Sequence, residues 1–347
     1  MAENTMKISK TADLEYTQQA VPKEERQSFF QVSSVILGYE FIVTSIQVGS
    51  TMGQMADLKT ILLAILAGSA FLMVLGGFIA FIASRNGITF GQLSEFSFGE
   101  KGSKFISTLI ALSLVGWFSV DIYLVGQATN ALFPSVPIIP VVIIAGVLMT
   151  FTAIFGMKLM SKLGSVSVPL ILIFGVYSMI RAISDFGGFD NLFAANVGQT
   201  VSFVSLVSLA IGSWVASAVT LLPDIIRYAK NEKQALIIAA IAILFGNALM
   251  MIIGAIGTIT TGQGELSYVL AAQGLIAPAW LIMVVNNWSA AQGCAYSGAL
   301  TMGSVTGKPH KPLTIAIGAI GILMAAFGFY DSFGSFIIFL SSTVPVL

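Results

Sequence analysis

Two acidic side chains lie deep inside long apolar segments of this chain. They are Glu40, in the run Leu37-Gly38-Tyr39-Glu40, and Asp121, four residues after Trp117. A charge at mid-bilayer costs roughly 2.5–3.5 kcal/mol even on a lenient scale, so such a group usually marks a paired site or a functional cavity. The alternative is a protonated carboxyl that hydrogen-bonds a neighbouring helix. We assign Asp121 to ligand recognition and Glu40 to cation or proton coupling at the ligand site.

Two tryptophans could hold a flat ligand near these acids. Trp117 and Asp121 are one helical turn apart and therefore share a face. Trp214 follows Gly212-Ser213 in another apolar segment. Tryptophans in membrane proteins often serve only as interfacial anchors or in packing, but both of these lie at mid-span. Offset stacking between the two rings would suit a planar heterocycle, with Ser213 close by.

A polar stripe crosses a third apolar segment. It consists of Asn286, Asn287, Ser289 and Gln292. Amide and hydroxyl oxygens of this kind are the ligands that a hard cation such as sodium prefers. The stripe predicts an ion site, with Gln292 directed to the ligand.

The elements that carry these residues are membrane-spanning helices. The 347 residues are 56% hydrophobic and only 9% charged, with a mean hydropathy of +0.92, whereas soluble proteins carry roughly 25% charged residues. About 20 apolar residues span the hydrocarbon core. We predict one all-α membrane domain with spans at 29–55, 59–84, 104–130, 137–156, 159–183, 203–226, 234–259, 277–304 and 312–330. A tenth span begins near Ser332 and is still apolar at Leu347, so it looks cut short.

The loop charges predict the orientation of these spans. Cytoplasmic loops hold the excess of Lys and Arg. With a cytoplasmic N-terminus, fourteen such residues fall inside and only Lys59 and Arg181 fall outside. Residues 1–28 are polar and mixed in charge, without the pattern of a signal peptide. We predict that they form a partly disordered cytoplasmic tail.

Two spans are interrupted by glycine and polar residues at their middle. The first contains Gly38 and Glu40, followed by Thr44 and Ser45, and the sixth contains Gly212-Ser213-Trp214. Close helix packing explains either cluster alone. Their matching positions in two five-helix halves indicate an inverted-repeat transporter with broken helices 1 and 6. The repeats would cover about 29–183 and 203–347 within a domain of 29–347.

Several other functions fit the composition poorly. The formal net charge is zero without a basic stripe, which disfavours nucleic acid as a partner. Cys294 is the only cysteine and His310 the only histidine, so we expect neither an enzyme nor a zinc or haem cofactor. A channel would need rings of like groups along a pore, whereas the polar residues here gather at one depth. A membrane sensor that binds ligand without transporting it stays open.

Short motifs in order along the chain resemble the nucleobase–cation symporter family, most closely the bacterial cytosine permeases. The resemblance runs from about Gln31 to Leu347. It rests on Leu37-Gly38, Phe96-Ser97-Phe98-Gly99, Lys101-Gly102-Ser103, Val115-Gly116-Trp117-Phe118, Gly212-Ser213-Trp214, Asp224 with Arg227, Gly246-Asn247, Gln273-Gly274-Leu275, and Asn286 with Trp288 and Tyr296. It implies a five-plus-five inverted-repeat fold, usually followed by two peripheral helices that would be missing here.

The resemblance also implies where the ligands bind. Sodium would lie at backbone carbonyls near Gly38 and Ile42, with Asn286 and Ser289. The substrate would lie between Trp117 and Trp214. The chain departs from cytosine permeases in having Ala290 where they have a second hydroxyl, Ala216 in place of a serine, and Ala291-Gln292 in place of an Asn-Asp pair. Asp121 stands where hydantoin transporters carry glutamine, and Glu95 replaces an arginine.

These features together predict sodium-coupled import, by alternating access, of cytosine or a related aminopyrimidine. Proton coupling through Glu40 is the alternative, and a purine, a hydantoin-like compound or the hydroxymethyl aminopyrimidine would also fit the site. A carboxylate such as Asp121 accepts a hydrogen bond from an exocyclic amine. We expect a multi-pass monomer in the bacterial inner membrane.

Overall fold

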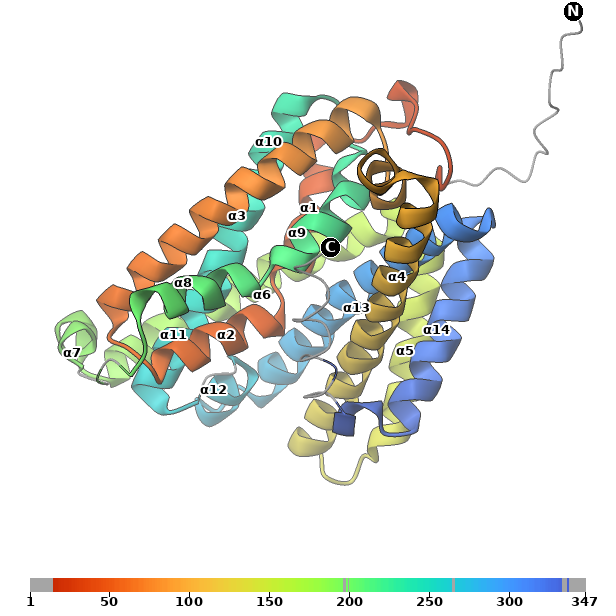
Figure 1. The fold of residues 1–347 in the computed structure, drawn as a ribbon. Coiled ribbons are helices and arrows are strands. Elements are labelled where there is room, and N and C mark those ends of the chain that lie inside the picture. The colour runs from red at the N-terminus through yellow and green to blue at the C-terminus, as the bar shows by residue number, and fades with distance from the viewer. Residues whose placement is uncertain (1–14, 196–197, 199, 264–265, 333–335, 337–347) are drawn as a thin grey trace, which may run out of the picture.

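The computed structural model describes residues 15–195, 198, 200–263, 266–332 and 336, and its named elements are all helices (Figure 1). The first half contains α1 (Phe29–Glu40), α2 (Val43–Gly53), α3 (Leu58–Asn86), α4 (Phe90–Leu132), α5 (Ile138–Ile154) and α6 (Met157–Asp185). The second half contains α7 (Gly188–Ala194), α8 (Phe203–Gly212), α9 (Val215–Ile226), α10 (Glu232–Ala240), a π-helix (Ile241–Asn247), α11 (Ala248–Thr261), α12 (Leu266–Ala272), α13 (Ile276–Thr306) and α14 (His310–Ala326).

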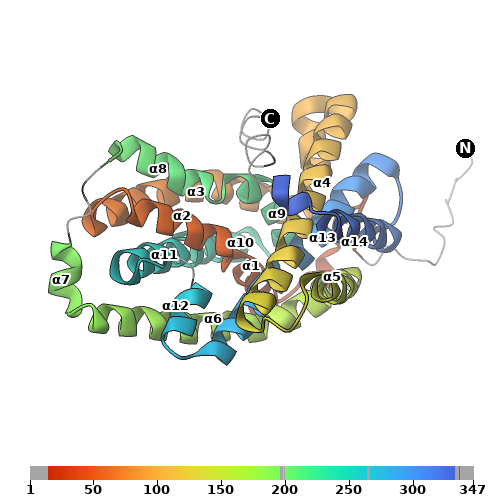
Figure 2. The same ribbon diagram turned by 90° about the horizontal axis from the view of Figure 1, so that it is seen from below.

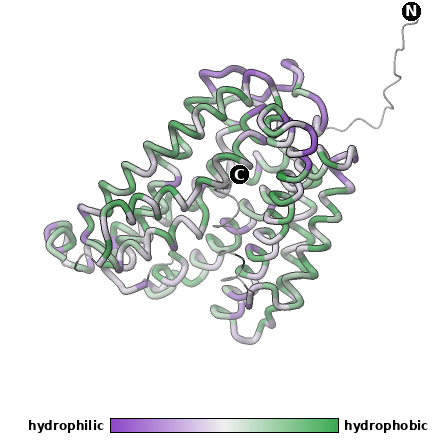
Figure 3. Tube along the Cα trace, viewed as in Figure 1, coloured by the Kyte–Doolittle hydropathy of each residue, from purple (hydrophilic) through white to green (hydrophobic). Residues whose placement is uncertain are grey.

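The long helices are those of a multi-pass membrane protein. The helices α3, α4 and α6 and the continuous Glu232–Thr261 are each long and apolar enough to cross a bilayer. The pair α1 and α2 passes the same test as one span bent by 48°, and α13 with α14 passes across a bend of 119°. Apart from the hydrophilic end of the molecule where residues 15–28 lie, the trace is largely hydrophobic (Figure 3). Within the described residues, nine of the ten expected spans correspond to a helix or a helix pair. The tenth lies almost wholly outside those residues.

Both expected breaks are present. Helix α1 ends at Glu40 and α2 begins at Val43, with Ile42 in an extended conformation between them. In the sixth span, Trp214 has φ −141° and ψ −2° and separates α8 from α9. Each repeat therefore begins with a helix that is interrupted within the membrane, where only a sheltering protein environment tolerates free backbone groups.

The helices form two groups, which Figures 1 and 2 show from two directions. On one side, α2 packs against α11 and α3 packs against α8, α9 and α10. On the other side, α4, α5, α13 and α14 pack against one another. Helix α6 contacts α1, α11 and α13 and so lies against both groups. The two broken helices belong to the first group and face the second.

The helices extend beyond the expected spans at three places. Helix α4 begins at Phe90 rather than near residue 104, and the Phe-Ser-Phe-Gly motif lies on this helix, where Gly99 forms a kink with φ 67° and ψ 174°. Only glycine adopts such a backbone without strain, so the charged stretch between two expected spans can continue as helix. The short helices α7 and α12 lie in connections between expected spans.

Residues 15–28 of the tail that we expected to be partly disordered pack against the helices, and residues 1–14 of it lie outside the described residues. Thr17 and Val21 are buried. The Val21 amide donates to the Gly87 carbonyl after α3 (2.9 Å), and the Gln18 side chain donates to the Gly303 carbonyl of α13 (3.4 Å). We call residues 15–28 the N-terminal strap. The backbone partner of Gln18 is 285 positions away and one partner of Arg26 is 58 positions away, so no local sequence pattern predicts these contacts.

Glu15 is the anchor of the N-terminal strap. Its Oε2 accepts hydrogen bonds from the hydroxyls of Tyr228 (2.9 Å) and Tyr296 (2.7 Å). Arg227 donates to the backbone carbonyls of Glu15 (2.7 Å) and Tyr16 (3.1 Å). The loops that we assigned to the cytoplasmic side thus meet at one end of the molecule around the N-terminal strap.

The opposite end carries the two exceptions in the charge count. Lys59 lies in the first turn of α3 and Arg181 near the end of α6. Their neighbours Leu58 and Ile183 share one buried apolar cluster with residues of α7 and α11. The alternation of loops between two ends therefore agrees with the span order read from the sequence.

Candidate functional site

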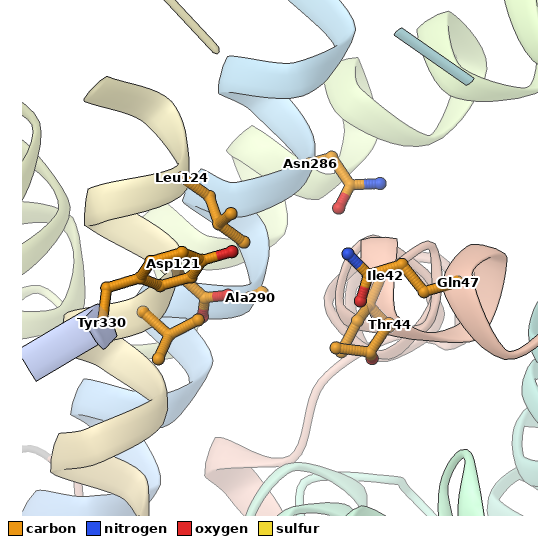
Figure 4. A pocket seen from close by; sticks show the side chains of 9 residues that line it. Ile42, Thr44, Gln47, Asp121, Leu124, Asn286, Ala290 and Tyr330 are labelled. Carbon is orange, nitrogen blue, oxygen red and sulfur yellow. The ribbon is translucent and has the colours of Figure 1, made fainter. Parts of the chain in front are cut away.

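A pocket lies where the break in the first span faces α4 and α13 (Figure 4). Figure 4 shows Asp121 and Tyr330 on one side and Thr44 and Gln47 on the other. The pocket is lined by Ile42, Thr44, Gln47, Val120, Asp121, Leu124, Asn286, Ala290 and Tyr330. Three of the predicted site residues from different spans, Ile42, Asp121 and Asn286, therefore share one cavity.

Asp121 gives the pocket its acidic group. The side chain is 6% exposed on α4, a helix with a long apolar run around it. One turn earlier, the ring of Trp117 meets Phe336 edge to face, with centroids 5.7 Å apart and an interplanar angle of 69°. Tyr330 stacks on Tyr123 with centroids 4.7 Å apart. The polar pocket is thus bordered by aromatic rings.

Trp214 occupies the break in the sixth span. The side chain is 2% exposed, and its indole N–H has no hydrogen-bond acceptor within the described part of the chain. Trp214 belongs to the same apolar cluster as the residues that pack around Trp117. Neither tryptophan lines the pocket. Ser213 turns to Asn247 of the π-helix, with the Asn247 Nδ2 3.2 Å from the Ser213 Oγ.

The predicted ion-site residues Gly38 and Ser289 lie side by side. A Cβ atom placed on Gly38 would be 3.5 Å from the Ser289 Oγ and 3.4 Å from the Ser167 Oγ of α6. The two serine hydroxyls are 3.3 Å apart. The amide of Ile42, which would pair with the Gly38 carbonyl if the helix continued, donates to the Glu40 carbonyl instead (2.8 Å). The break thus removes the usual helical partner of the Gly38 carbonyl.

Asn286 connects this cluster to the pocket. Its Nδ2 donates to the carbonyl of Phe41, while its buried Oδ1 has no partner among the described residues. The carbonyl of Ile42, which we predicted as an ion ligand, accepts from the Ser45 amide (3.2 Å). The Phe41 carbonyl therefore faces Asn286, one residue before the predicted one. Buried oxygens from Gly38, Asn286, Ser289 and Ser167 suit a hard monovalent cation.

Glu40 and Gln292 are buried outside the pocket lining. Glu40 is fully buried, and neither carboxylate oxygen has a hydrogen-bond partner in the described part of the structure. The Gln292 Oε1 on α13 is likewise unpartnered. Buried polar groups without partners are rare and need a reason, such as a bound species or a proton. The structure thus keeps both residues as candidates without bringing them to the pocket wall.

Asp224 and Arg227, which form one of the motifs of the resemblance, each hold a backbone group elsewhere in the chain. The Asp224 Oδ1 accepts from the backbone amide of Phe90 (2.8 Å), at the start of α4. Arg227 donates through Nε to the backbone carbonyl of Asp224 (3.0 Å), and its guanidinium continues to the N-terminal strap. These two residues therefore hold helix ends and the strap in place, away from the pocket.

Sequence reasoning missed several residues that the structure brings to the site. Thr44 and Gln47 follow the first break, and their polarity in an apolar span was a usable signal. Phe41 was missed because a break is hard to place to one residue. Ser167 resembles many small residues of α6, and only the packing of α6 on α1 reveals it.

Comparison with known proteins identifies the family of the chain. Residues 20–344 match the model of the family described as permease for cytosine/purines, uracil, thiamine, allantoin. The cytosine permease of Escherichia coli K12 is 34% identical over 337 residues, which cover 96% of this chain and 79% of that protein. The hydantoin permease of Microbacterium maritypicum is 25% identical over 185 residues, covering 50% of this chain and 37% of that one.

Solved structures share the fold. A nucleobase–cation-symport-1 family transporter in a closed conformation with bromovinylhydantoin bound superposes with a TM-score of 0.80 at 18% identity, covering 90% of this chain and 74% of that one. A Na⁺-coupled sialic acid symporter in a substrate-bound outward-open state gives 0.72 at 13% identity, covering 93% and 79%. These similarities confirm the expected inverted-repeat transporter fold. Both curated relatives are permeases, as expected for a transporter rather than an enzyme, and the chain belongs to the nucleobase–cation symporter family.

Proposed function

We propose that this permease imports cytosine or a related aminopyrimidine, driven by sodium, through alternating access. The observation that carries the proposal is the position of Asn286. It lines the pocket that contains Asp121, and its amide also bonds the Phe41 carbonyl at the break in the first span. One side chain would therefore sense both the ligand and the ion.

The ligand would be held by stacking and by one carboxylate. Trp117 and Trp214 belong to one apolar region. Offset stacking on such rings favours flat ligands. The Asp121 carboxylate would accept a hydrogen bond from an exocyclic amine or pair with a protonated ring nitrogen. Gln292 and Ser213 would complete the selection at the edge of the site.

The co-transported ion would bind between the first and eighth spans. Its oxygen ligands would be the carbonyls of Gly38 and Phe41, the Asn286 amide and the Ser289 hydroxyl, with Ser167 close by. Ion binding there would order the broken first helix and so raise the affinity for the heterocycle. Such coupling is reciprocal, so the heterocycle would raise sodium affinity by the same factor.

The end of the molecule that is closed indicates which side of the membrane the pocket would face. The N-terminal strap joins the loops at one end, and the pocket borders α2 and Tyr330 toward the other. With the N-terminus in the cytoplasm of a bacterial cell, as the loop charges favour, the pocket would face the outside. We propose that the permease acts as a monomer in the inner membrane.

Uptake into proteoliposomes tests the proposal. An inward sodium gradient should drive accumulation of radiolabelled cytosine, whereas an equal choline gradient should not. Binding measured in detergent should be tighter in sodium than in choline. Binding without accumulation would instead identify a membrane ligand sensor, and equal affinity in both salts would exclude sodium symport.

Glu40 favours proton coupling as a second candidate. Its carboxyl group at the end of α1 is fully buried and has no partner among the described residues, as expected of a group that carries a proton. Glu40→Gln should abolish uptake if a proton on Glu40 is the coupling ion. If sodium is the coupling ion, the variant should only lower uptake. A purine, a hydantoin-like compound and hydroxymethyl aminopyrimidine should be compared with cytosine in the same assay.

A further inference from the structure

Asn247 is the last residue of the segment in which the seventh span departs from regular α-helix. Residues Ile241–Asn247 form a π-helix between α10 and α11. Turns of this kind are rare and often occur at functional sites. The Asn247 side chain is fully buried, and a carboxamide at such depth needs hydrogen-bond partners for both of its ends.

The two partners of Asn247 come from the two broken helices. Its Oδ1 accepts from the Ser45 Oγ (2.7 Å), in the first turn of α2 just after the first break. Its Nδ2 donates to the Ser213 Oγ (3.2 Å), which ends α8 at the second break. The Ser213 hydroxyl in turn donates to the Ala210 carbonyl (2.7 Å). One carboxamide thus bonds both interruptions, which are 168 residues apart in sequence, from Ser45 to Ser213.

The π-helix also contacts the other half of the first break. A Cβ atom on Gly246 would lie 3.2 Å from the Cβ of Glu40 and 3.3 Å from the Cδ2 of Leu37. Glu40 is the last residue of α1, close to the Phe41 carbonyl that bonds Asn286. A shift of α1 at the proposed ion site would therefore displace the π-helix directly.

Helices α2 and α11 are too closely packed to move independently. A Cβ on Gly49 would lie 1.8 Å from the Met251 carbonyl oxygen, and a Cβ on Gly254 would lie 1.9 Å from the Ile46 carbonyl oxygen. Packed interfaces of this kind have discrete arrangements rather than continuous ones. The bond from Ser45 to Asn247 continues this contact to the break, and the bond to Ser213 extends it to the sixth span.

We propose that Asn247 is a positioning residue that couples the two breaks. When the ion orders the first span, the change is passed through the Asn247 carboxamide to Ser213 and Trp214, which belong to the proposed ligand site. This inference rests on the proposed sodium symport. Asn247 itself touches neither ion nor ligand. It determines how strongly one changes the affinity for the other, which for coupled sites is typically a factor of about 5–150.

The test measures cytosine affinity in purified protein with saturating sodium and with choline. In the wild type the ratio of the two dissociation constants gives the coupling factor. Asn247→Leu, which keeps the branched skeleton of the side chain but removes both hydrogen bonds, should bring this ratio close to one and change the affinity in choline less than about threefold. Ser45→Ala should lower the ratio in the same direction while Asn247 remains in place, which guards against a folding defect in the first variant.

Thr258→Val is the matched control. Thr258 bonds the Ser50 hydroxyl (2.7 Å) between the same two helices, α11 and α2, away from both breaks. The control should retain the wild-type ratio. An unchanged ratio in both Asn247→Leu and Ser45→Ala would overturn the inference, and so would an equal loss of affinity with and without sodium. If the wild type itself shows a ratio of one, sodium symport fails and the inference falls with it.

Discussion

Asp121 and Ala290 face the same pocket from neighbouring helices, yet they should affect different ligands. Asp121 is the acidic side chain among the residues that line it, and Ala290 lies close to the cluster around Asn286. A charged acceptor contributes to ligand recognition only where the ligand offers a donor. A hard cation is bound through oxygen ligands, so a missing hydroxyl lowers its affinity.

Replacing Asp121 by asparagine should distinguish ligands that differ at one exocyclic group. The amine of cytosine would lose a charge-assisted hydrogen bond, worth about 1.5–3 kcal/mol, or roughly 10- to 150-fold in affinity. Uracil has a carbonyl at that position and should lose much less. Competition binding of the two compounds to wild type and Asp121→Asn measures this difference. An equal loss for both would remove Asp121 from the recognition of the amine.

Replacing Ala290 by serine should strengthen sodium binding. The new hydroxyl would add an oxygen beside Asn286. Cytosine permeases are expected to have a hydroxyl at this position. The sodium concentration for half-maximal uptake should fall, with cytosine affinity at saturating sodium nearly unchanged. An unchanged sodium requirement would mean that the ion binds away from Ala290.

The close contact between the helices α6 and α1 holds the residues of the proposed ion site in place. A Cβ on Gly164 would lie 2.1 Å from the Ser34 carbonyl oxygen of α1. Because backbone offers no flexible atoms to move aside, α1 would have to shift, and Gly38 would change its distance from Ser167 of α6.

Gly164→Ala should therefore destabilise the protein and weaken ion binding together. Overpacking of this kind typically costs about 1–3 kcal/mol. Thermal unfolding in detergent, with and without sodium, measures both effects. Gly175→Ala on the same helix is the control, because its Cβ would meet only the flexible ends of Ile253 and Leu266, at 3.2 and 3.6 Å. Equal losses in both variants would argue that the α1 contact has no special role.

The elements were predictable where the cause is local, and the site was predictable only in part. Hydropathy and loop charges predict the spans, and polar residues at mid-span predict both breaks. The π-helix has no local signal, because it inserts one residue into an otherwise apolar span. The contacts of Asn247 could therefore not be predicted, because they reach residues 202 and 34 positions away. Asp121 and Asn286 were found because acids and amides are costly in lipid, whereas Ser167 needed the packing of α6.

At the scale of the whole molecule, the N-terminal strap contacts both helix groups. Glu15 contacts Tyr228, which follows α9, and Tyr296 of α13, with Arg227 close by. A rocking motion of one group against the other would have to break these contacts at one end.

The pH dependence of stability should report on Glu15. Burial raises the pKa of the Glu15 carboxyl above its ordinary value of 4.5, against hydrogen bonds from Tyr296 and Tyr228 that lower it. A raised pKa in the folded state means that the stabilisation is complete below pH 4.5 and is lost as pH rises through the folded-state value. Melting temperatures of the wild type should therefore fall with rising pH relative to those of Glu15→Gln. The exposed Glu24 of the same segment supplies the control Glu24→Gln, which should follow the wild type. Parallel curves for wild type and Glu15→Gln would contradict the expectation.

The anchoring of Glu15 has a consequence for biosynthesis. Its two hydroxyl donors are encoded 213 and 281 residues after it. At about 5–20 residues per second, a ribosome would deliver Tyr296 roughly 15–60 s after Glu15. Glu15 must remain unanchored while most of the helices enter the bilayer, and its contacts with Tyr228 and Tyr296 then complete the docking of residues 15–28. Protection of this segment from protease during synthesis would therefore separate finished molecules from chains that still lack α13.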